Sequence, residues 1–320
     1  MSLFSRLYHR YIQFGGFRLI WEYTKLGAFT DFVRQGIDVL IGKRTIANAY
    51  SQIQAKTIPY IRKKYEGLLK KYIEKYSNSD LQHVHNNKVW VCWLQGMDEA
   101  PEIVKVCHRS LLCHLKNREI IVITQKNLSQ YVTFPEHIQE KFQKGIIPMA
   151  QYTDLLRLEL LTRYGGTWID ATVLCSGEHY PKEILDADLF FFQHLRKGET
   201  KFLGISNWFI TASSNQKVLL ILRDMIYQYW KDYDCLIAYF IFHIFFTMIA
   251  EQMPEEIAKM PRKSNKLCFY LEHRLADKYD DAWMKELIDR CCFHKLNVRL
   301  WKEAESRDDS FLCKIKGLYP

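Results

Sequence analysis

The spacing of apolar residues predicts alternating strands and helices through the middle of the chain. Short runs rich in β-branched and aromatic residues at 88–93 and 120–124 have the length of strands, and residues 101–115 between them have the period of a helix. A strand, a helix and a second strand in this order favour a right-handed crossover between parallel strands. The sequence therefore predicts an α/β fold with a mostly parallel sheet flanked by helices.

A long apolar run at 235–250 raises the question of a membrane span. It contains His243 as its one strongly polar residue, but it is short for crossing a bilayer, so a buried helix is the better interpretation. The other elements predicted from periodicity are helices at 58–76, 216–230 and 234–251 and strands at 188–193 and 207–211.

A helix that ends in a glycine turn before a strand is predicted at residues 152–173. Leucine recurs at every third position through the middle of the helix. Thr153 or Asp154 can cap the start of the helix, and Gly165 can adopt the left-handed conformation that ends it. Residues 168–173, which follow the glycine turn, have the composition of a strand.

Three charged residues flank this helix–turn–strand unit. Asp154 and Arg157 lie one turn apart on the predicted helix, and the turn returns Asp170 along the neighbouring element, so we expect the three to converge. Taken singly, each has a structural interpretation: Asp154 with Arg157 as a surface ion pair, and Asp170 as a charge at a strand edge. Their occurrence together with the glycine pair favours a site for a charged small molecule.

The stretch resembles the signature of the capsular polysaccharide synthesis proteins and the related family 32 glycosyltransferases. The pattern is Thr-Asp-x-x-Arg, then Leu, then Gly-Gly-x-aromatic-x-Asp, and the likeness extends over about residues 88–295. The resemblance implies a nucleotide-diphospho-sugar transferase domain of the GT-A type, with Asp154, Arg157 and Asp170 as catalytic residues. It implies a hexosyltransferase that acts with retention and moves the sugar from a UDP-sugar to a lipid-linked or oligosaccharide acceptor in bacterial surface polysaccharide synthesis.

The resemblance also implies a divalent cation, Mn²⁺ or Mg²⁺, bound by Asp170. The family motif is usually Asp-x-Asp, and this chain has Thr172 at the second acidic place, so the remaining ligands must lie elsewhere. Related transferases use a C-terminal histidine for the metal and a nearby lysine for the diphosphate, and His294 with Lys295 resembles that pair. An ordinary surface histidine and lysine are the alternative.

Candidate partners for the donor follow from the same resemblance. Asp154 would accept hydrogen bonds from sugar hydroxyls, and Arg157 would donate to the sugar or to the leaving phosphate. Trp93 would stack on the uracil with Gln95 and Gly96 beside it, although a core tryptophan is nearly as good an interpretation of Trp93. The remaining donor-binding candidates are the glycines of the turn, Gly165 and Gly166.

Basic residues are concentrated at the start of the chain. Residues 1–86 contain 14 Lys/Arg against 6 Asp/Glu, which accounts for +8 of the net charge of +9. Large apolar residues are interspersed with them, as in helices that lie on a membrane surface with cations on anionic lipids. A helical arm packed on the main domain, with a solvated basic face, has the same periodicity and is an equal alternative. Nucleic acid is not expected as a partner, because no recognised binding motif accompanies these charges.

Composition indicates one catalytic domain with an appendage. The 320 residues are 48% hydrophobic and can bury a large core. We predict a basic helical extension at 1–86, the catalytic domain at 87–300 and a C-terminal tail at 301–320. The nine cysteines form no Cys-x-x-Cys pair and are expected to be reduced. The start of the chain does not resemble a secretory signal, so we expect a cytoplasmic protein, held at most peripherally on the membrane.

Two other functions are consistent with the sequence. Thr172 in place of an acid is consistent with a catalytically silent protein of the same fold that acts as a scaffold at the membrane. The basic aromatic N-terminus alone is consistent with a peripheral lipid-binding protein. Binding and turnover of a UDP-sugar would separate the leading hypothesis, a glycosyltransferase, from both alternatives.

Overall fold

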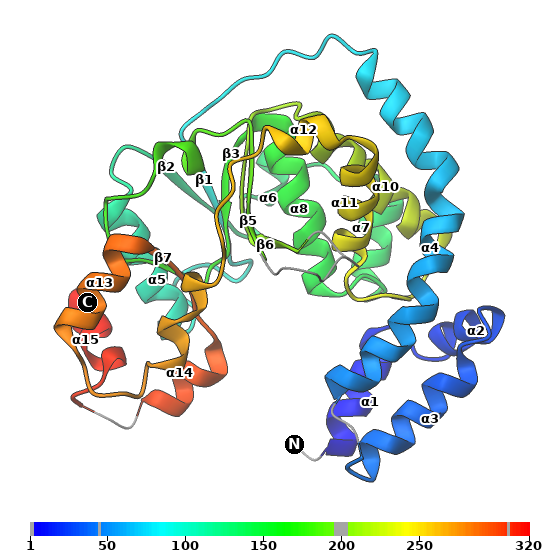
Figure 1. Ribbon diagram of the computed structural model, residues 1–320, viewed down its shortest axis with the longest axis horizontal. Coiled ribbons are helices and arrows are strands. Elements are labelled where there is room, and N and C mark those ends of the chain that lie inside the picture. The colour runs from blue at the N-terminus through cyan, green and yellow to red at the C-terminus, as the bar shows by residue number, and fades with distance from the viewer. Residues whose placement is uncertain (1–2, 44–45, 195–203, 306–307) are drawn as a thin grey trace. The chain divides into compact units, whose positions relative to one another are not determined.

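A computed structural model describes residues 3–43, 46–194, 204–305 and 308–320 (Figure 1). The chain forms two compact units, and it passes from one to the other five times along the sequence. The first unit consists of Met1–Asp80, Thr133–Leu158 and Lys217–Pro254, and the second of Leu81–Val132, Glu159–Gln216 and Glu255–Pro320. The predicted sequential division at 86/87 and 300/301 stays a prediction.

The first unit is built from helices. The long helix α4 (Ile46–Ser77) contacts α3 (Phe29–Leu40), α10 (Lys217–Asp232) and α11 (Ile241–Gln252). Ile61, Tyr65 and Leu69 recur at spacing four on α4 and are buried, which explains why this side of the helix packs. The unit also contains α1 (Leu3–Gln13), α2 (Phe17–Lys25), α7 (Glu136–Gln143) and the first part of α8 (Met149–Tyr164).

The apolar run at 235–250 is a buried core segment, as the sequence predicted. Its helix, α11, starts later than expected, at Ile241, and nearly every side chain from Ile241 to Ala250 is buried. Within the described ranges no helix is both long enough and apolar enough to cross a bilayer.

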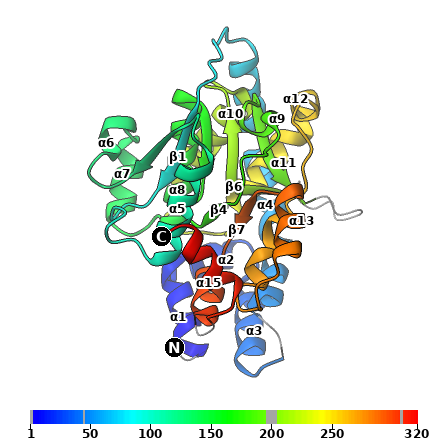
Figure 2. The same ribbon diagram turned by 90° about the vertical axis from the view of Figure 1, so that its left-hand side faces the viewer.

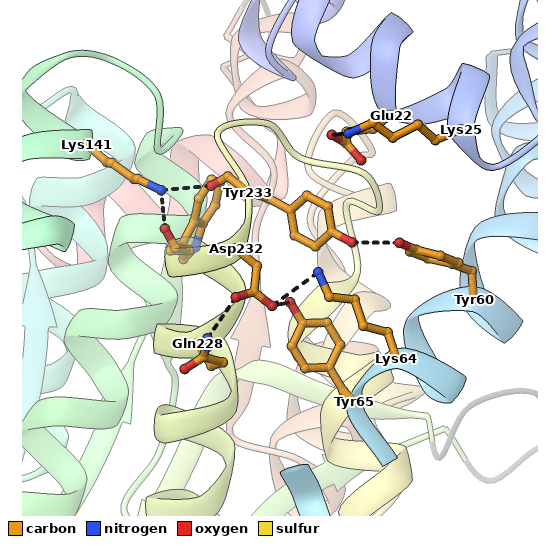
Figure 3. Close-up of polar contacts among 10 residues, drawn as sticks. Glu22, Lys25, Tyr60, Lys64, Tyr65, Lys141, Gln228, Asp232 and Tyr233 are labelled. Carbon is orange, nitrogen blue, oxygen red and sulfur yellow. Dashed lines mark hydrogen bonds and ion pairs between the residues drawn. The ribbon is translucent and has the colours of Figure 1, made fainter. Parts of the chain in front are cut away.

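Polar contacts fasten α4 to α10 at the surface of this helical core (Figure 3). The carboxylate of Asp232 accepts hydrogen bonds from Tyr65 at 2.8 Å and from Gln228 at 2.7 Å, and Lys64 lies 3.1 Å from it. Burial alone would raise the pKa of Asp232, but these three donors outweigh burial and hold the pKa below its usual value. The ionised carboxylate is therefore the stable partner in this contact.

The second unit contains a five-stranded sheet in the order β2-β1-β3-β6-β5. β1 is parallel to β2 and β3, whereas β6 is antiparallel to β3 and β5, so four of the five strands share one direction. The predicted mostly parallel α/β sheet is confirmed. The strands are β1 (Lys88–Cys92), β2 (Glu119–Ile123), β3 (Gly166–Ile169), β5 (Leu189–Gln193) and β6 (Ile205–Ala212).

A two-stranded antiparallel ladder follows the end of β3 in this unit. β4 (Val173–Cys175) pairs with β7 (Phe293–Lys295), and the two lie side by side in Figure 2. This ladder brings the C-terminal part of the chain to the end of β3. The predicted strand at 168–173 is in fact two strands, because the chain turns at Asp170, whose carbonyl accepts a hydrogen bond from the Val173 amide.

The C-terminal residues are not an irregular tail. α14 (Val298–Ala304) and α15 (Phe311–Leu318) pack into a buried cluster with α5 (Glu102–His114). Trp301, Phe311 and Ile315 are buried there. The chain is polar and less regular in pattern from Phe293 on, but each helix keeps one apolar side, and that side supplies the packing. The remaining elements are α6 (Leu128–Tyr131), α9 (Lys182–Leu185), α12 (Pro254–Ala258), α13 (Asp281–Arg290), η1 (Leu267–Phe269) and η2 (Leu271–His273).

Candidate functional site

The glycine turn before β3 has the predicted conformation. Gly165 and Gly166 have φ of 73° and 95°, in the region that favours glycine. A Cβ on Gly165 would lie 2.7 Å from the Ser214 amide nitrogen, and one on Gly166 would collide with the Lys88 carbonyl. The neighbouring strand backbone thus requires both glycines. Their predicted contact with a donor stays a prediction.

Asp170 occupies the position after β3 and is held on both sides. Its amide donates to the Trp208 carbonyl at 2.9 Å. Its Oδ1 accepts from the indole Nε1 of Trp168 at 2.9 Å. Ligands of parallel sheets bind at the carboxyl ends of strands, and this is where Asp170 lies.

Lys295 completes this arrangement from β7. Its Nζ donates to Oδ2 of Asp170 at 2.8 Å and to Oγ1 of Thr172 at 2.9 Å. The ladder explains the contact, because Lys295 pairs with Val173 and the Leu296 amide donates to the Thr172 carbonyl. The side chains of Lys295 and Asp170 are 22% and 25% exposed, so solvent and small anions can reach them. We refer to Asp170, Thr172 and Lys295 as the cation cluster.

Glu272 is a further charged residue near the cation cluster that the sequence did not single out. It lies on η2, and its side chain is 13% exposed. Burial raises the pKa of this carboxyl, while the charges of His273 and Lys295 lower it in part. No spacing in the sequence links Glu272 to Asp170, and its neighbour Leu271 is buried, so only the fold reveals that it belongs to this region.

His294 points to the other side of β7. Neighbouring residues of a strand face opposite sides, so His294 and Lys295 diverge. His294 is fully buried, and its Nε2 lies 2.7 Å from the Ser176 hydroxyl. Burial lowers its pKa to about 3, so it is neutral at physiological pH. Its Nδ1 finds no hydrogen-bond partner among the described residues.

These residues do not fit a divalent metal ion in the observed arrangement. An ammonium group already lies on one carboxylate oxygen of Asp170, an indole N–H lies on the other, and His294 faces Ser176. Among the residues that the structure describes, no three His, Cys, Asp or Glu side chains are grouped as a metal ion needs. The predicted ligand set of Asp170 and His294 therefore stays a prediction, and we assign no step to the metal.

Asp154 and Arg157 form an ion pair on α8, within the first unit. The Arg157 guanidinium lies 3.1 Å from Oδ1 of Asp154, and the two side chains are 6% and 8% exposed. The alternative of a surface pair is thus wrong, because both groups are buried. The predicted helix cap at Thr153 or Asp154 is also wrong: α8 starts at Met149, after Pro148, so both residues lie in its second turn.

The Asp154–Arg157 ion pair and Asp170 belong to different units. Asp154 and Arg157 lie before the point where α8 passes into the second unit, and Asp170 lies after it. Their predicted convergence on one ligand therefore stays a prediction.

The uracil candidates follow β1 directly. Residues 93–96 form a turn in which the Gly96 amide donates to the Trp93 carbonyl at 2.9 Å, and Gly96 has φ of 91°. Trp93 is partly buried against the same apolar cluster as Ala171, the residue between Asp170 and Thr172. Gln95 is exposed. The core interpretation of Trp93 and the stacking interpretation are both compatible with this half-buried position.

Comparison with known proteins gives one extensive sequence match. A family model described as "Capsular polysaccharide synthesis protein" matches residues 40–315. No curated protein matches the chain. One similar solved structure is "PaToxG Glycosyltransferase", with 12% identity, a TM-score of 0.36, and coverage of 82% of this chain and 98% of that chain. A likeness of this degree is too low to bear on function.

Proposed function

The chain belongs to the capsular polysaccharide synthesis protein family, and on this premise we propose that it is a glycosyltransferase that moves a hexose from a UDP-sugar to a lipid-linked or oligosaccharide acceptor. The observation that carries the proposal is the cation cluster at the carboxyl end of β3, where α/β sheets bind ligands. Retention at the anomeric carbon, and a location in the cytoplasm next to the inner membrane, belong to the same proposal.

The proposed reaction replaces one bond at the anomeric carbon with another and releases the proton of the acceptor hydroxyl. The bond from the anomeric carbon to the diphosphate oxygen breaks, the acceptor hydroxyl oxygen bonds to that carbon, and the hydroxyl proton is released. The diphosphate leaves with additional negative charge, so a cation positioned before the reaction favours its departure. Lys295 supplies such a cation, a compact ammonium on a flexible stem.

Asp170 and Thr172 position this ammonium. Both accept hydrogen bonds from the Lys295 Nζ and hold it at the end of β3. Because an ammonium has three donors, it keeps one for a phosphate oxygen while it contacts both residues. Asp170 thus acts through Lys295, as a positioning residue.

Metal assistance is a separate proposal. An incoming Mn²⁺ or Mg²⁺ ion would have to displace the Lys295 ammonium from Asp170 and take its remaining ligands from phosphate oxygens and water. Asp170 is the one predicted ligand that is compatible with this.

A panel of nucleotide sugars, read as release of free nucleotide diphosphate, tests the proposal. We expect one or a few UDP-sugars to be hydrolysed slowly without acceptor, and the rate to fall at least about tenfold in Lys295→Met because transition-state charge is lost. The exposed Lys302 provides a matched control, since Lys302→Met removes the same charge from α14. If no nucleotide sugar binds or is hydrolysed, the glycosyltransferase proposal fails and the scaffold alternative replaces it.

A further inference from the structure

The helices α2 and α3 each bury one side and expose another. Leu19 and Tyr23 of α2 and Val39 of α3 are buried. Hydrogen bonds connect this segment to the rest of the first unit. The Leu236 amide donates to the Phe14 carbonyl, before α2, at 2.8 Å, and the Tyr23 hydroxyl donates to the Ile237 carbonyl at 3.0 Å. The packed-arm alternative is therefore correct for one side of these helices.

The other side is apolar as well and remains in solvent. Phe17 is 84% exposed and Trp21, one turn later on α2, is 63% exposed. On α3, Val33 and Ile37 repeat the same spacing and are 41% and 52% exposed. A packed arm with a solvated basic face would not place large apolar side chains in water at helical spacing. We call Tyr8, Ile12, Phe17, Trp21, Val33 and Ile37 the N-terminal apolar surface.

Ring contacts and helix contacts connect the three helices that carry this surface. The Tyr11 ring lies 6.4 Å from Tyr8 within α1 and 6.2 Å from Phe17 of α2. α2 in turn contacts α3, where the rings of Tyr23 and Phe32 are 5.4 Å apart. The exposed apolar residues of the three helices are thus part of one packed assembly within the first unit.

Cations are interspersed with these apolar side chains. Arg18 and Lys25 of α2 are exposed, although each has an acidic neighbour: Arg18 lies 3.8 Å from Asp234, and Lys25 lies 2.8 Å from Glu22. The Lys25 ammonium also lies 5.3 Å from the centre of the Trp21 ring. Arg34 of α3 is exposed between Val33 and Ile37. Over residues 3–43 the sequence has 6 Lys/Arg against 3 Asp/Glu. Exposed aromatic and aliphatic residues beside exposed cations match the interface of a bilayer with anionic headgroups.

We propose that the N-terminal apolar surface docks the protein on an anionic lipid bilayer. Phe17, Trp21 and the exposed residues of α1 and α3 enter the boundary between headgroups and acyl chains, and Arg18, Lys25 and Arg34 contact lipid phosphates. Charge complementarity favours lipid over a second copy of this chain, because two copies would bring the same cations together. The proposal does not depend on the glycosyltransferase activity.

Co-sedimentation of the full-length protein with vesicles tests the proposal. We expect binding to vesicles of phosphatidylglycerol and phosphatidylethanolamine, weak binding to phosphatidylcholine alone, and weaker binding at high salt. The double variant Phe17→Ser/Trp21→Ser should lose at least about tenfold in affinity, because two exposed side chains no longer leave water. Leu112→Ser on α5, 52% exposed, is the matched control and should bind like wild type.

The folded state of the variants is checked by the thermal unfolding midpoint, which should not fall because the changed side chains are exposed. Vesicle binding that is equal for wild type and the double variant overturns the proposal. Sedimentation without lipid supplies a second check: an oligomer that the double variant dissociates shows that the surface joins two copies instead. Vesicle binding that does not depend on lipid charge or on salt would also overturn the proposal, since the cations would then have no role.

Discussion

The ammonium of Lys295 lies 2.8 Å from the Asp170 carboxylate, although 125 residues separate the two in the sequence. The β4–β7 ladder creates this contact, because it pairs Lys295 with Val173, three residues after Asp170. A motif near the middle of the chain and a lysine near its end thereby share one site. The charge of that site depends on both.

Replacing Lys295 should weaken nucleotide binding. In Lys295→Met the cation that faces the diphosphate is lost, and the charge of Asp170 no longer has that ammonium beside it, so we expect the affinity for UDP to fall by roughly tenfold to a hundredfold. Isothermal titration calorimetry measures the change. Asp170→Asn keeps the Lys295 ammonium but removes the carboxylate that positions it, so we expect a smaller loss of UDP affinity. An unchanged affinity in Lys295→Met would show that the diphosphate lies elsewhere.

Metal dependence should be weak in the wild type and stronger without the lysine. Because Lys295 already lies on Asp170, we expect EDTA or added Mn²⁺ to change UDP affinity less than about tenfold. In Lys295→Met the freed carboxylate can accept a cation, so Mn²⁺ should restore part of the lost affinity. A wild-type affinity that rises more than about a hundredfold with Mn²⁺ contradicts this expectation and supports the metal proposal.

The ion pair of Asp154 and Arg157 should be sensitive to removal of one partner. Asp154→Asn removes the Asp154 carboxylate from beside the buried Arg157 guanidinium, so the free energy of unfolding should fall by about 3 kcal/mol or more. Chemical denaturation measures this value. Adding Arg157→Met should recover part of the loss, because the buried guanidinium charge is then removed as well. A matched control is Glu66→Gln, which removes the partner of exposed Lys70 on α4 and should cost at most about 1 kcal/mol.

Activity separates a structural role of that pair from a functional one. If the pair also contacts the donor sugar, the double variant Asp154→Asn/Arg157→Met should stay inactive although its stability is partly recovered. A double variant that regains turnover together with stability would make the pair structural.

The contact between Tyr65 and Asp232 should contribute to the stability of the helical unit. Tyr65→Phe removes one hydrogen bond to a charged acceptor and should lower the free energy of unfolding by about 1.5–3 kcal/mol. Because the pKa of Asp232 is lowered in the folded state, its contribution is present above the unfolded value and is lost as pH falls through the lower folded one. Denaturation of wild type and Asp232→Asn at pH 7 and pH 3 measures this loss. Equal pH dependence of the two proteins would contradict the assignment.

Buried His294 should make the protein sensitive to acid. Its pKa is about 3 in the folded protein and about 6.5 in the unfolded chain, so the unfolded state alone binds a proton between these values. The stability is therefore lost as pH falls below about 6.5, and the loss at pH 5 amounts to about 2 kcal/mol. His294→Gln should be less sensitive to pH than wild type. The exposed His273 serves as control, since His273→Gln should follow the wild type.

The regular elements of the second unit were predictable because their signals are local. Strand-length apolar runs predicted β1 and β2, and the glycine pair predicted a turn whose φ values the structure confirms. The start of α8 was misplaced, because Thr153 and Asp154 have the composition of a cap but Pro148 precedes an earlier first turn. Cap residues indicate a boundary only when they are not already inside a longer helix.

The site was predictable in part for the same reason. Asp170 and Lys295 each belong to a recognisable local pattern, but no pattern shows that they meet, since their contact depends on a ladder between distant segments. The sequence favoured the neighbouring His294 as a site residue as much as Lys295. Because neighbouring residues of a strand face opposite sides, His294 lies in the core instead. No sequence pattern indicated that Glu272 lies near this site. Residue type and spacing thus identified candidates, while tertiary pairing decided which of them share a site.

The interleaved course of the chain limits how this protein can be cut into parts. An expression fragment that begins after residue 86 would lack α4 and leave the sides of α10 and α11 that contact it exposed to water. Such a fragment would aggregate even if every residue of the cation cluster were present. Truncation before residue 87 therefore cannot isolate a stable second half, and two separately expressed pieces would regain a common fold only by reassociating through the missing helix.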